Sequence, residues 1–113
     1  MKEENVCQFN CPNDLKYIQD TLYVISGKWK VLIIVSLSAG HKRYREIAKS
    51  IPNITFRMLS KELKELEMNK LVTRKVYPET PVLIEYEITE YCKTLWPMLS
   101  EMINWAKHHR TVI

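Results

Sequence analysis

The stretch ITFRMLSKELKELEMN, residues 54–69, decides how the rest of the chain can be arranged. It contains no Gly or Pro and is rich in strong helix formers. Thr55 is a good helix N-cap, because its hydroxyl can accept a hydrogen bond from a free N–H group of the first turn. At about 100° per residue the apolar side chains share one face. They are Leu59, Leu63 and Leu66, with Phe56 at the edge. The pattern predicts a helix that is buried along one side.

The opposite face of this predicted helix carries cations and a hydroxyl. Its residues are Arg57, Ser60, Lys61 and Lys64. A half-buried helix that offers such a stripe to solvent is suited to the major groove of DNA. An ordinary solvated helix face has a similar composition. The segments on either side must therefore distinguish the two interpretations.

The segment before this helix predicts a second, shorter one. Residues 44–50 place Ile47 and Ala48 inward, and Pro52 and Asn53 form a turn into the longer helix. The basic residues 41–43 can be extended. Two short helices joined by a tight turn, the second exposing cations, form the helix-turn-helix arrangement.

The segment after it predicts a β-hairpin. Residues 71–77 alternate like a strand, residues 78–81 form a turn, and residues 83–89 alternate again. The second strand places Glu85 and Glu87 on one face and its apolar side chains on the other. A hairpin directly after the second helix is called a wing in DNA-binding proteins.

Two further helices are predicted upstream. Residues 15–25 repeat apolar side chains at helical spacing, and Gly27 is suited to the left-handed conformation that follows a helix end. Residues 28–38 restart as a helix that is apolar nearly all round, so we expect it in the core. Its apolar residues are Trp29, Leu32, Ile33, Val35 and Leu37.

A long terminal helix is predicted over residues 90–109, with more apolar positions than the edge of one small domain needs. The additional apolar side chains, together with those of residues 15–25, are suited to an interface between two copies related by a two-fold axis. The alternative is that Trp96 and Trp105 fill the chain's own core. The residues expected at a dimer interface are Leu15, Ile18, Leu22, Leu95, Trp96, Leu99, Ile103 and Trp105.

The chain has 113 residues, enough for one domain with a real core, and we expect an ordered part over about residues 11–109. Charge is unevenly placed. Residues 41–75 hold ten Lys or Arg and four Glu, a net +6 in a chain whose total is +4. A basic middle with mildly acidic flanks indicates a polyanionic partner.

Several classes of protein are disfavoured. The longest uncharged apolar run, residues 31–37, is far too short to span a bilayer, and residues 1–14 have no apolar signal core, so a cytoplasmic location without membrane association is expected. Three cysteines then argue against a disulfide framework. With two Gly, no phosphate loop and no metal-ligand cluster, we expect no enzyme, cofactor or metal site.

Short motifs follow one another in a specific order along nearly the whole chain. They are Cys11–Pro12, Gly27–Lys28–Trp29, Gly40 with Arg43–Tyr44–x–Glu46–Ile47, Ile54–Thr55–x–x–Met58–Leu59–x–x–x–Leu63–x–x–Leu66–Glu67, Leu71–Val72–x–Arg74, and Pro81–x–x–x–Glu85–Tyr86–x–Ile88–Thr89. With them the sequence resembles the HxlR-type branch of the MarR-like winged helix-turn-helix transcriptional regulators. The resemblance implies a mainly α (α+β) winged helix-turn-helix with N- and C-terminal dimerisation helices.

The resemblance also implies a homodimer on double-stranded DNA. Two recognition helices would enter successive major grooves of a pseudo-palindromic operator, roughly 34–36 Å apart. Arg57 is expected on a guanine edge, because its fork matches O6 and N7. Ser60 and Lys61 would reach bases or adjacent phosphates. The residues expected on phosphates are Thr55, Lys64, Lys42, Arg43 and Arg45. For Arg43 and Arg45, ion pairing with Glu46 or another carboxylate is an equal alternative.

The sequence departs from the family pattern at two turns. Lys70 stands where Gly is usual, and we expect Asn69 to adopt the left-handed conformation instead. The wing tip has Val82 and Leu83 in place of an Arg, so backbone contacts are expected from Arg74 and Lys75 at the base of the wing.

Cys11 occupies a place where several members of the family sense oxidants or electrophiles. Residues 13–15 start a helix nearby, and a helix N-terminus lowers the pKa of a thiol. Cys7 could serve as a resolving thiol. The alternative is that Cys11 is a small apolar residue at the dimer interface; Cys92 is expected only to pack.

The family most often represses transcription, so a repressor is expected. The sequence identifies neither the operator nor a small-molecule effector. A function from another class is a winged helix used only for protein–protein contacts. That alternative predicts a neutral or acidic recognition helix, whereas this one is cationic.

Overall fold

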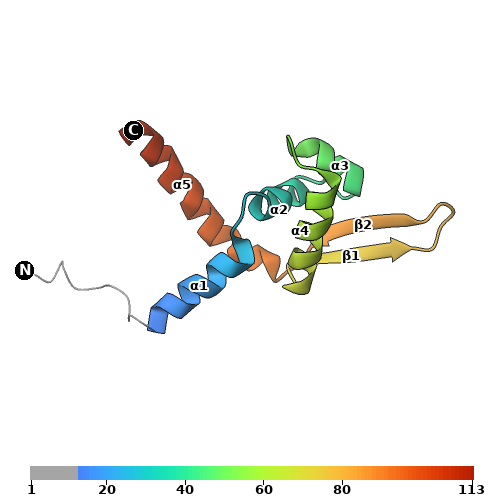
Figure 1. The fold of residues 1–113 in the computed structure, drawn as a ribbon, viewed down its shortest axis with the longest axis horizontal. Helices are drawn as coiled ribbons and strands as arrows, with labels where there is room; N and C mark the ends of the chain where they lie inside the picture. The colour runs from blue at the N-terminus through green and yellow to red at the C-terminus, as the bar shows by residue number, and fades with distance from the viewer. Residues whose placement is uncertain (1–12) are drawn as a thin grey trace, which may run out of the picture.

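A computed structural model describes residues 13–113 of the chain (Figure 1). Its elements are α1 (Asn13–Ile25), α2 (Lys30–Ser38), α3 (Tyr44–Ser50), α4 (Phe56–Met68), β1 (Val72–Tyr77), β2 (Leu83–Ile88), the 3₁₀ turn η2 (Cys92–Leu95) and α5 (Trp96–Val112). The order of helices, turn and hairpin confirms the predicted winged helix-turn-helix.

The core lies where α2, α3 and α4 meet the base of the wing. Its fully buried side chains come from every one of these elements and from η2, so the helix-turn-helix and the wing share one apolar cluster. They are Ile33, Ile34, Ile47, Leu59, Leu63, Leu66, Leu71, Val72 and Cys92. The three predicted inward leucines of the recognition helix are thus confirmed, and Cys92 packs as expected.

The recognition helix α4 begins as its sequence predicts. Thr55 is the N-cap, and its Oγ1 accepts a hydrogen bond of 3.1 Å from the backbone N–H of Met58. This bond satisfies one of the donors that the first turn leaves free. The cap fixes the start of the helix.

The wing is a two-stranded antiparallel sheet in which Val72 pairs with Ile88 and Tyr77 with Leu83. The extended segment before α3 lies along β2 of this sheet, because the N–H of Tyr86 in β2 donates to the carbonyl of Lys42 at 2.9 Å. At the base of the wing, Thr89 Oγ1 donates to the carbonyl of Lys70 at 2.8 Å. The wing is therefore tied both to the segment before α3 and to the turn after α4.

The turn after α4 differs from the prediction. Lys70 itself adopts the left-handed conformation, with φ of 64°, whereas Asn69 stays at φ −89°. Asn69 instead caps the helix, since its backbone N–H and its side-chain Nδ2 both donate to the carbonyl of Glu65. The left-handed position lies one residue later than expected because Asn69, as the C-cap, still donates its backbone N–H to the Glu65 carbonyl.

Helix α2 begins at Lys30 rather than at residue 28, and it is buried on one side only. Ile33 and Ile34 are fully buried, but Leu32 and Val35 are 46% and 51% exposed. The prediction of burial all round was wrong for these two residues. Apolar periodicity cannot separate a residue that faces the chain's own core from one left on an apolar surface.

The terminal helix also starts later than predicted. Residues 92–95 form a 3₁₀ turn, and α5 runs from Trp96 to Val112 rather than over residues 90–109. Pro97 lies in the first turn of α5, where its missing N–H costs no helical hydrogen bond.

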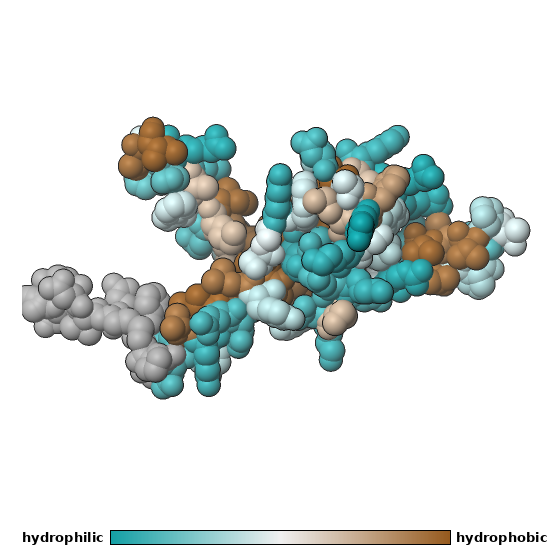
Figure 2. Space-filling view, in the orientation of Figure 1, coloured by the Kyte–Doolittle hydropathy of each residue, from teal (hydrophilic) through white to brown (hydrophobic). Residues whose placement is uncertain are grey.

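Helices α1 and α5 extend away from the winged body (Figure 1). In the space-filling view, apolar side chains gather along the side of α1 that is turned toward α5, and hydrophilic ones lie on its opposite side (Figure 2). Among the described residues no single helix could cross a membrane, although the bent pair α1 and α2, at 65°, meets that test of length and composition together.

Candidate nucleic-acid interface

The exposed face of α4 presents the predicted cationic stripe to solvent. Arg57, Ser60, Lys61 and Lys64 are all exposed, opposite the buried leucines. Lys61 Nζ lies 3.5 Å from Glu65, one turn along the helix. Within residues 13–113, neither Arg57 nor Lys64 has an ion pair or a side-chain hydrogen bond, so both charges are available to a ligand.

A buried ion cluster holds α4 against α2. Lys30 Nζ lies 2.6 Å from Glu62 Oε1 and 2.7 Å from Glu65 Oε1, and the Lys30 side chain is only 9% exposed. Burial alone would lower the pKa of Lys30, but the hydrogen bonds and charges of the two glutamates outweigh it and raise that pKa. This cluster could not be predicted from the sequence, because its partners come from different helices.

A tyrosine joins the two helices of the helix-turn-helix. Tyr44, the first residue of α3, donates its hydroxyl hydrogen to the carbonyl of Phe56, and its Oη lies 2.6 Å from Ser60 Oγ. Its ring lies 5.6 Å from the ring of Phe56, centroid to centroid. In the sequence Tyr44 stands out only as part of a family motif, because its contact with Ser60 depends on how the two helices pack.

Glu46 caps α3 rather than pairing with an arginine. Its Oε1 accepts from the backbone N–H groups of Lys42 at 3.0 Å and Arg43 at 3.1 Å. These bonds, led by the one from Arg43, lower the pKa of the Glu46 carboxyl. In the part of the chain that the structure describes, Arg43 and Arg45 form no ion pair, and both are exposed. Their guanidinium groups can therefore reach a partner.

The two cations at the base of the wing are not equivalent. Lys75 Nζ lies 2.9 Å from Glu87 Oε1 on the neighbouring strand. The hydrogen bond and charge of this pair raise the pKa of Lys75 and lower that of Glu87. Arg74, opposite Tyr86 and exposed, forms no ion pair among residues 13–113. Arg74 is the stronger candidate for a phosphate contact.

The residues expected at a dimer interface divide into two groups. The exposed ones, between 45% and 64%, are Leu15, Ile18, Leu22, Ile103 and Trp105. Leu99 is buried at 8% exposure, and Leu95 and Trp96 pack against the core. Leu99 therefore has little surface left for a second copy, whereas Leu95 and Trp96 are only partly buried. Trp96 packs in part against the chain's own core, and its place at a dimer interface stays a prediction.

The cysteines can be assessed only in part. Cys92 is fully buried, and burial raises the pKa of its thiol, so it is a packing residue. Cys7 and Cys11 lie outside the described residues. Within residues 13–113 no cluster of His, Cys, Asp and Glu could hold a metal ion.

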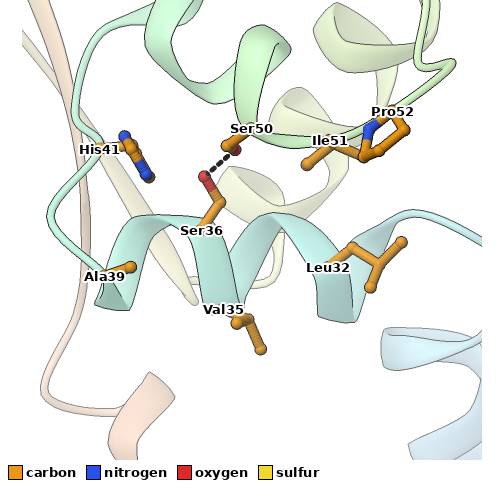
Figure 3. Close-up of a pocket in the computed structure, with 8 residues that line it drawn as sticks. All are labelled: Leu32, Val35, Ser36, Ala39, His41, Ser50, Ile51 and Pro52. Carbon is orange, nitrogen blue, oxygen red and sulfur yellow. Dashed lines mark hydrogen bonds between the residues drawn. The ribbon is translucent and has the colours of Figure 1, made fainter.

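An open cleft of about 280 Å³ lies along the exposed side of α2, beside the helix-turn-helix. Leu32 and Val35 line it together with Ile51 and Pro52 from the turn after α3. Figure 3 shows Ser36 and Ser50 facing one another across it, 2.6 Å apart. The exposed apolar side chains of α2 and the residues of the turn after α3 thus line one cleft together.

A helix α4 with a cationic exposed face, a preceding shorter helix and a two-stranded wing define a winged helix-turn-helix protein. A family model described as HxlR-like helix-turn-helix matches residues 24–112. The chain belongs to this family, and its relatives are HTH-type transcriptional regulators. The resemblance in the sequence is confirmed.

Individual relatives and solved structures support the same family assignment. An uncharacterized HTH-type transcriptional regulator of Bacillus subtilis (strain 168), YybR, is 40% identical over 96 residues, which are 85% of this chain and 77% of that protein. The structure is similar to the redox regulator HypR in its reduced form, with a TM-score of 0.78, 40% identity, and coverage of 85% of this chain and 95% of that one. It is also similar to diamide-treated YodB from B. subtilis, with a TM-score of 0.71 and 40% identity. That match covers 87% of this chain and 93% of the YodB chain. The chain is a transcriptional regulator of the HxlR type with redox regulators among its structural neighbours.

Proposed function

We propose that this regulator binds double-stranded DNA sequence-specifically, as a homodimer, with α4 in the major groove. The observation that carries the proposal is the pair of cations Arg57 and Lys64, unpaired within residues 13–113, on a helix whose other face is fully buried. A helix held rigidly by its buried face can place an Arg fork on a guanine edge. Repression, the commoner outcome in the family, is the direction proposed.

The contacts follow from the position of each group. Arg57 reads a guanine, and the exposed cations before and within α3 reach phosphates. Thr55 uses its Oγ1 lone pair in the helix cap and keeps its hydroxyl hydrogen for a phosphate. Arg74 is proposed on the backbone in preference to Lys75, whose charge Glu87 neutralises. The proposed phosphate contacts are Thr55, Lys64, Lys42, Arg43, Arg45 and Arg74.

The proposed dimer joins the exposed apolar faces of α1 and α5. In this 113-residue chain Leu22 is 53% exposed and Trp105 is 64% exposed. A second copy packed on these faces would bury both apolar side chains. A two-fold axis between two copies would place two α4 helices on a pseudo-palindromic operator, about 34–36 Å apart. No small-molecule effector is proposed.

We expect Arg57→Ala to abolish discrimination at one base pair, weakening binding to the preferred site about 10- to 100-fold with little loss on unrelated DNA. The measurement is fluorescence anisotropy with duplexes from the DNA upstream of the chain's own gene, at two salt concentrations. The matched control is Lys64→Ala, which should weaken binding to all sequences alike and reduce the salt dependence. Absence of binding by the wild type at low salt would favour the protein–protein alternative.

We further propose that Cys11 makes DNA binding responsive to oxidants. The support is the family resemblance at Cys11 and the similarity to the redox regulator HypR and to diamide-treated YodB. Diamide should change the operator affinity of the wild type, and Cys11→Ser should be insensitive. Cys7→Ser tests whether Cys7 acts as the resolving thiol, and buried Cys92 replaced by Ala is the control that should keep the response. An unchanged response in Cys11→Ser would assign Cys11 to packing.

A further inference from the structure

The hydrogen-bond direction between Tyr44 and Ser60 follows from counting protons. A tyrosine hydroxyl has one hydrogen, whereas a backbone carbonyl oxygen can only accept. The hydroxyl of Tyr44 is bonded to the carbonyl of Phe56, so its hydrogen lies on that bond. The second contact, 2.6 Å between Tyr44 Oη and Ser60 Oγ, then requires Ser60 to be the donor.

The usual alternative partner of Ser60 is already engaged. A serine within a helix often donates to the carbonyl four residues earlier, which for Ser60 is that of Phe56. This carbonyl accepts the helical N–H of Ser60 and the hydroxyl of Tyr44, which together use its two lone pairs. The Ser60 hydrogen is therefore directed to Tyr44.

Ser60 thus offers solvent only lone pairs. It is exposed on α4, one turn after Arg57 and one turn before Lys64, within the stripe proposed to enter the major groove. In that groove the donors on base edges are the amino groups of cytosine N4 and adenine N6, whereas guanine O6 and N7, thymine O4 and phosphate oxygens are acceptors. An acceptor-only hydroxyl discriminates between these two sets.

We propose that Tyr44 is a positioning residue for specificity, which orients the Ser60 hydroxyl so that Ser60 accepts a hydrogen bond from a cytosine or adenine amino group. The proposal rests on the proposed function, and it gives Ser60 a base edge rather than a phosphate. Tyr44 touches no base in this arrangement; it acts through the proton of Ser60.

The test uses Tyr44→Phe, which keeps the ring against Phe56 and removes only the hydroxyl. The full-length wild type and variant each select from a randomised duplex DNA library, and enriched duplexes are then titrated by fluorescence anisotropy. The wild type should prefer an amino-bearing base at one position by about tenfold over a carbonyl-bearing one. In Tyr44→Phe the Ser60 hydrogen has no fixed partner and can turn to the vacated Phe56 carbonyl, to water or to a base. The Ser60 hydroxyl can then donate as well as accept, so the preference at that position alone should fall below about threefold.

Two controls separate specificity from folding. Ser60→Ala should lose the same preference, and Tyr91→Phe, at an exposed tyrosine outside α3 and α4, should keep it. Urea midpoints check that each variant is folded. An unchanged base preference in Tyr44→Phe, or an equal loss of affinity on every duplex, would overturn the proposal. A wild type that enriches no sequence at low salt would overturn the proposed function itself, and the specificity role with it.

Discussion

Replacing Lys30 with methionine is expected to lower the free energy of unfolding by about 3 kcal/mol. The variant leaves the Glu62 carboxylate, 13% exposed, without the ammonium that lies 2.6 Å from it. Methionine fills a similar volume, so the effect comes from an unpaired buried charge rather than from a cavity. The measurement is urea unfolding followed by circular dichroism, at one fixed protein concentration because a dimer's apparent stability depends on it.

The matched control is Lys93→Met, which removes a lysine from an exposed ion pair of similar length, 2.9 Å to Glu90. That change should alter stability by less than about 1 kcal/mol. Adding Glu62→Leu to Lys30→Met removes the orphaned charge and should restore most of the loss. Equal stability of Lys30→Met and Lys93→Met would show that the cluster does not hold α4.

The same cluster predicts a dependence on pH. The hydrogen bond and charge of Lys30 lower the pKa of Glu65 below its ordinary 4.5, so its contribution is present above that pH and is lost as the pH falls further. The raised pKa of Lys30 implies a contribution that is present below 10.5 and lost as the pH rises through the folded-state value. Lys30→Met should flatten both limbs of the stability profile.

Replacing Ile103 with glutamate is expected to convert the proposed dimer to a monomer and to weaken operator binding by at least about 100-fold. The side chain is 56% exposed in the isolated chain, so the charge is tolerated there, but a two-fold interface would bury two copies of it. Separate half-sites then bind without the effective concentration that linkage provides, which is commonly worth about 10²- to 10⁴-fold. Sedimentation velocity measures the mass, and fluorescence anisotropy measures the binding.

Asn104→Glu is the control for this experiment, because it adds the same charge at the neighbouring exposed position of α5. Successive helical residues are about 100° apart, so this side chain leaves the apolar face. It should remain dimeric and bind DNA normally. A dimeric Ile103→Glu would place the interface elsewhere, with the open side of α2 as the next surface to test.

Much of the candidate site could be predicted from the sequence. The cap at Thr55, the three buried leucines of α4 and its cationic stripe follow from residues within one or two turns of each other. The hairpin follows equally from local alternation and a short turn, whereas its register comes from the structure. Where the local signal was ambiguous, the prediction was off by one residue. Asn69 and Lys70 both tolerate a turn, and the positive φ lies at Lys70 because Asn69 caps the helix.

The sequence by itself therefore determined the family, the order of elements and the face of α4 that meets solvent, because capping, periodicity and turn chemistry act between near neighbours. Only the tertiary structure decided which groups are paired. Lys30 and Glu62 are 32 residues apart, and Tyr44 and Ser60 are 16 apart. It also decided that Trp96 packs inward while Leu32 and Val35 stay exposed. Such pairings depend on how helices cross, and the pattern along any one helix is the same whichever neighbour covers its apolar side.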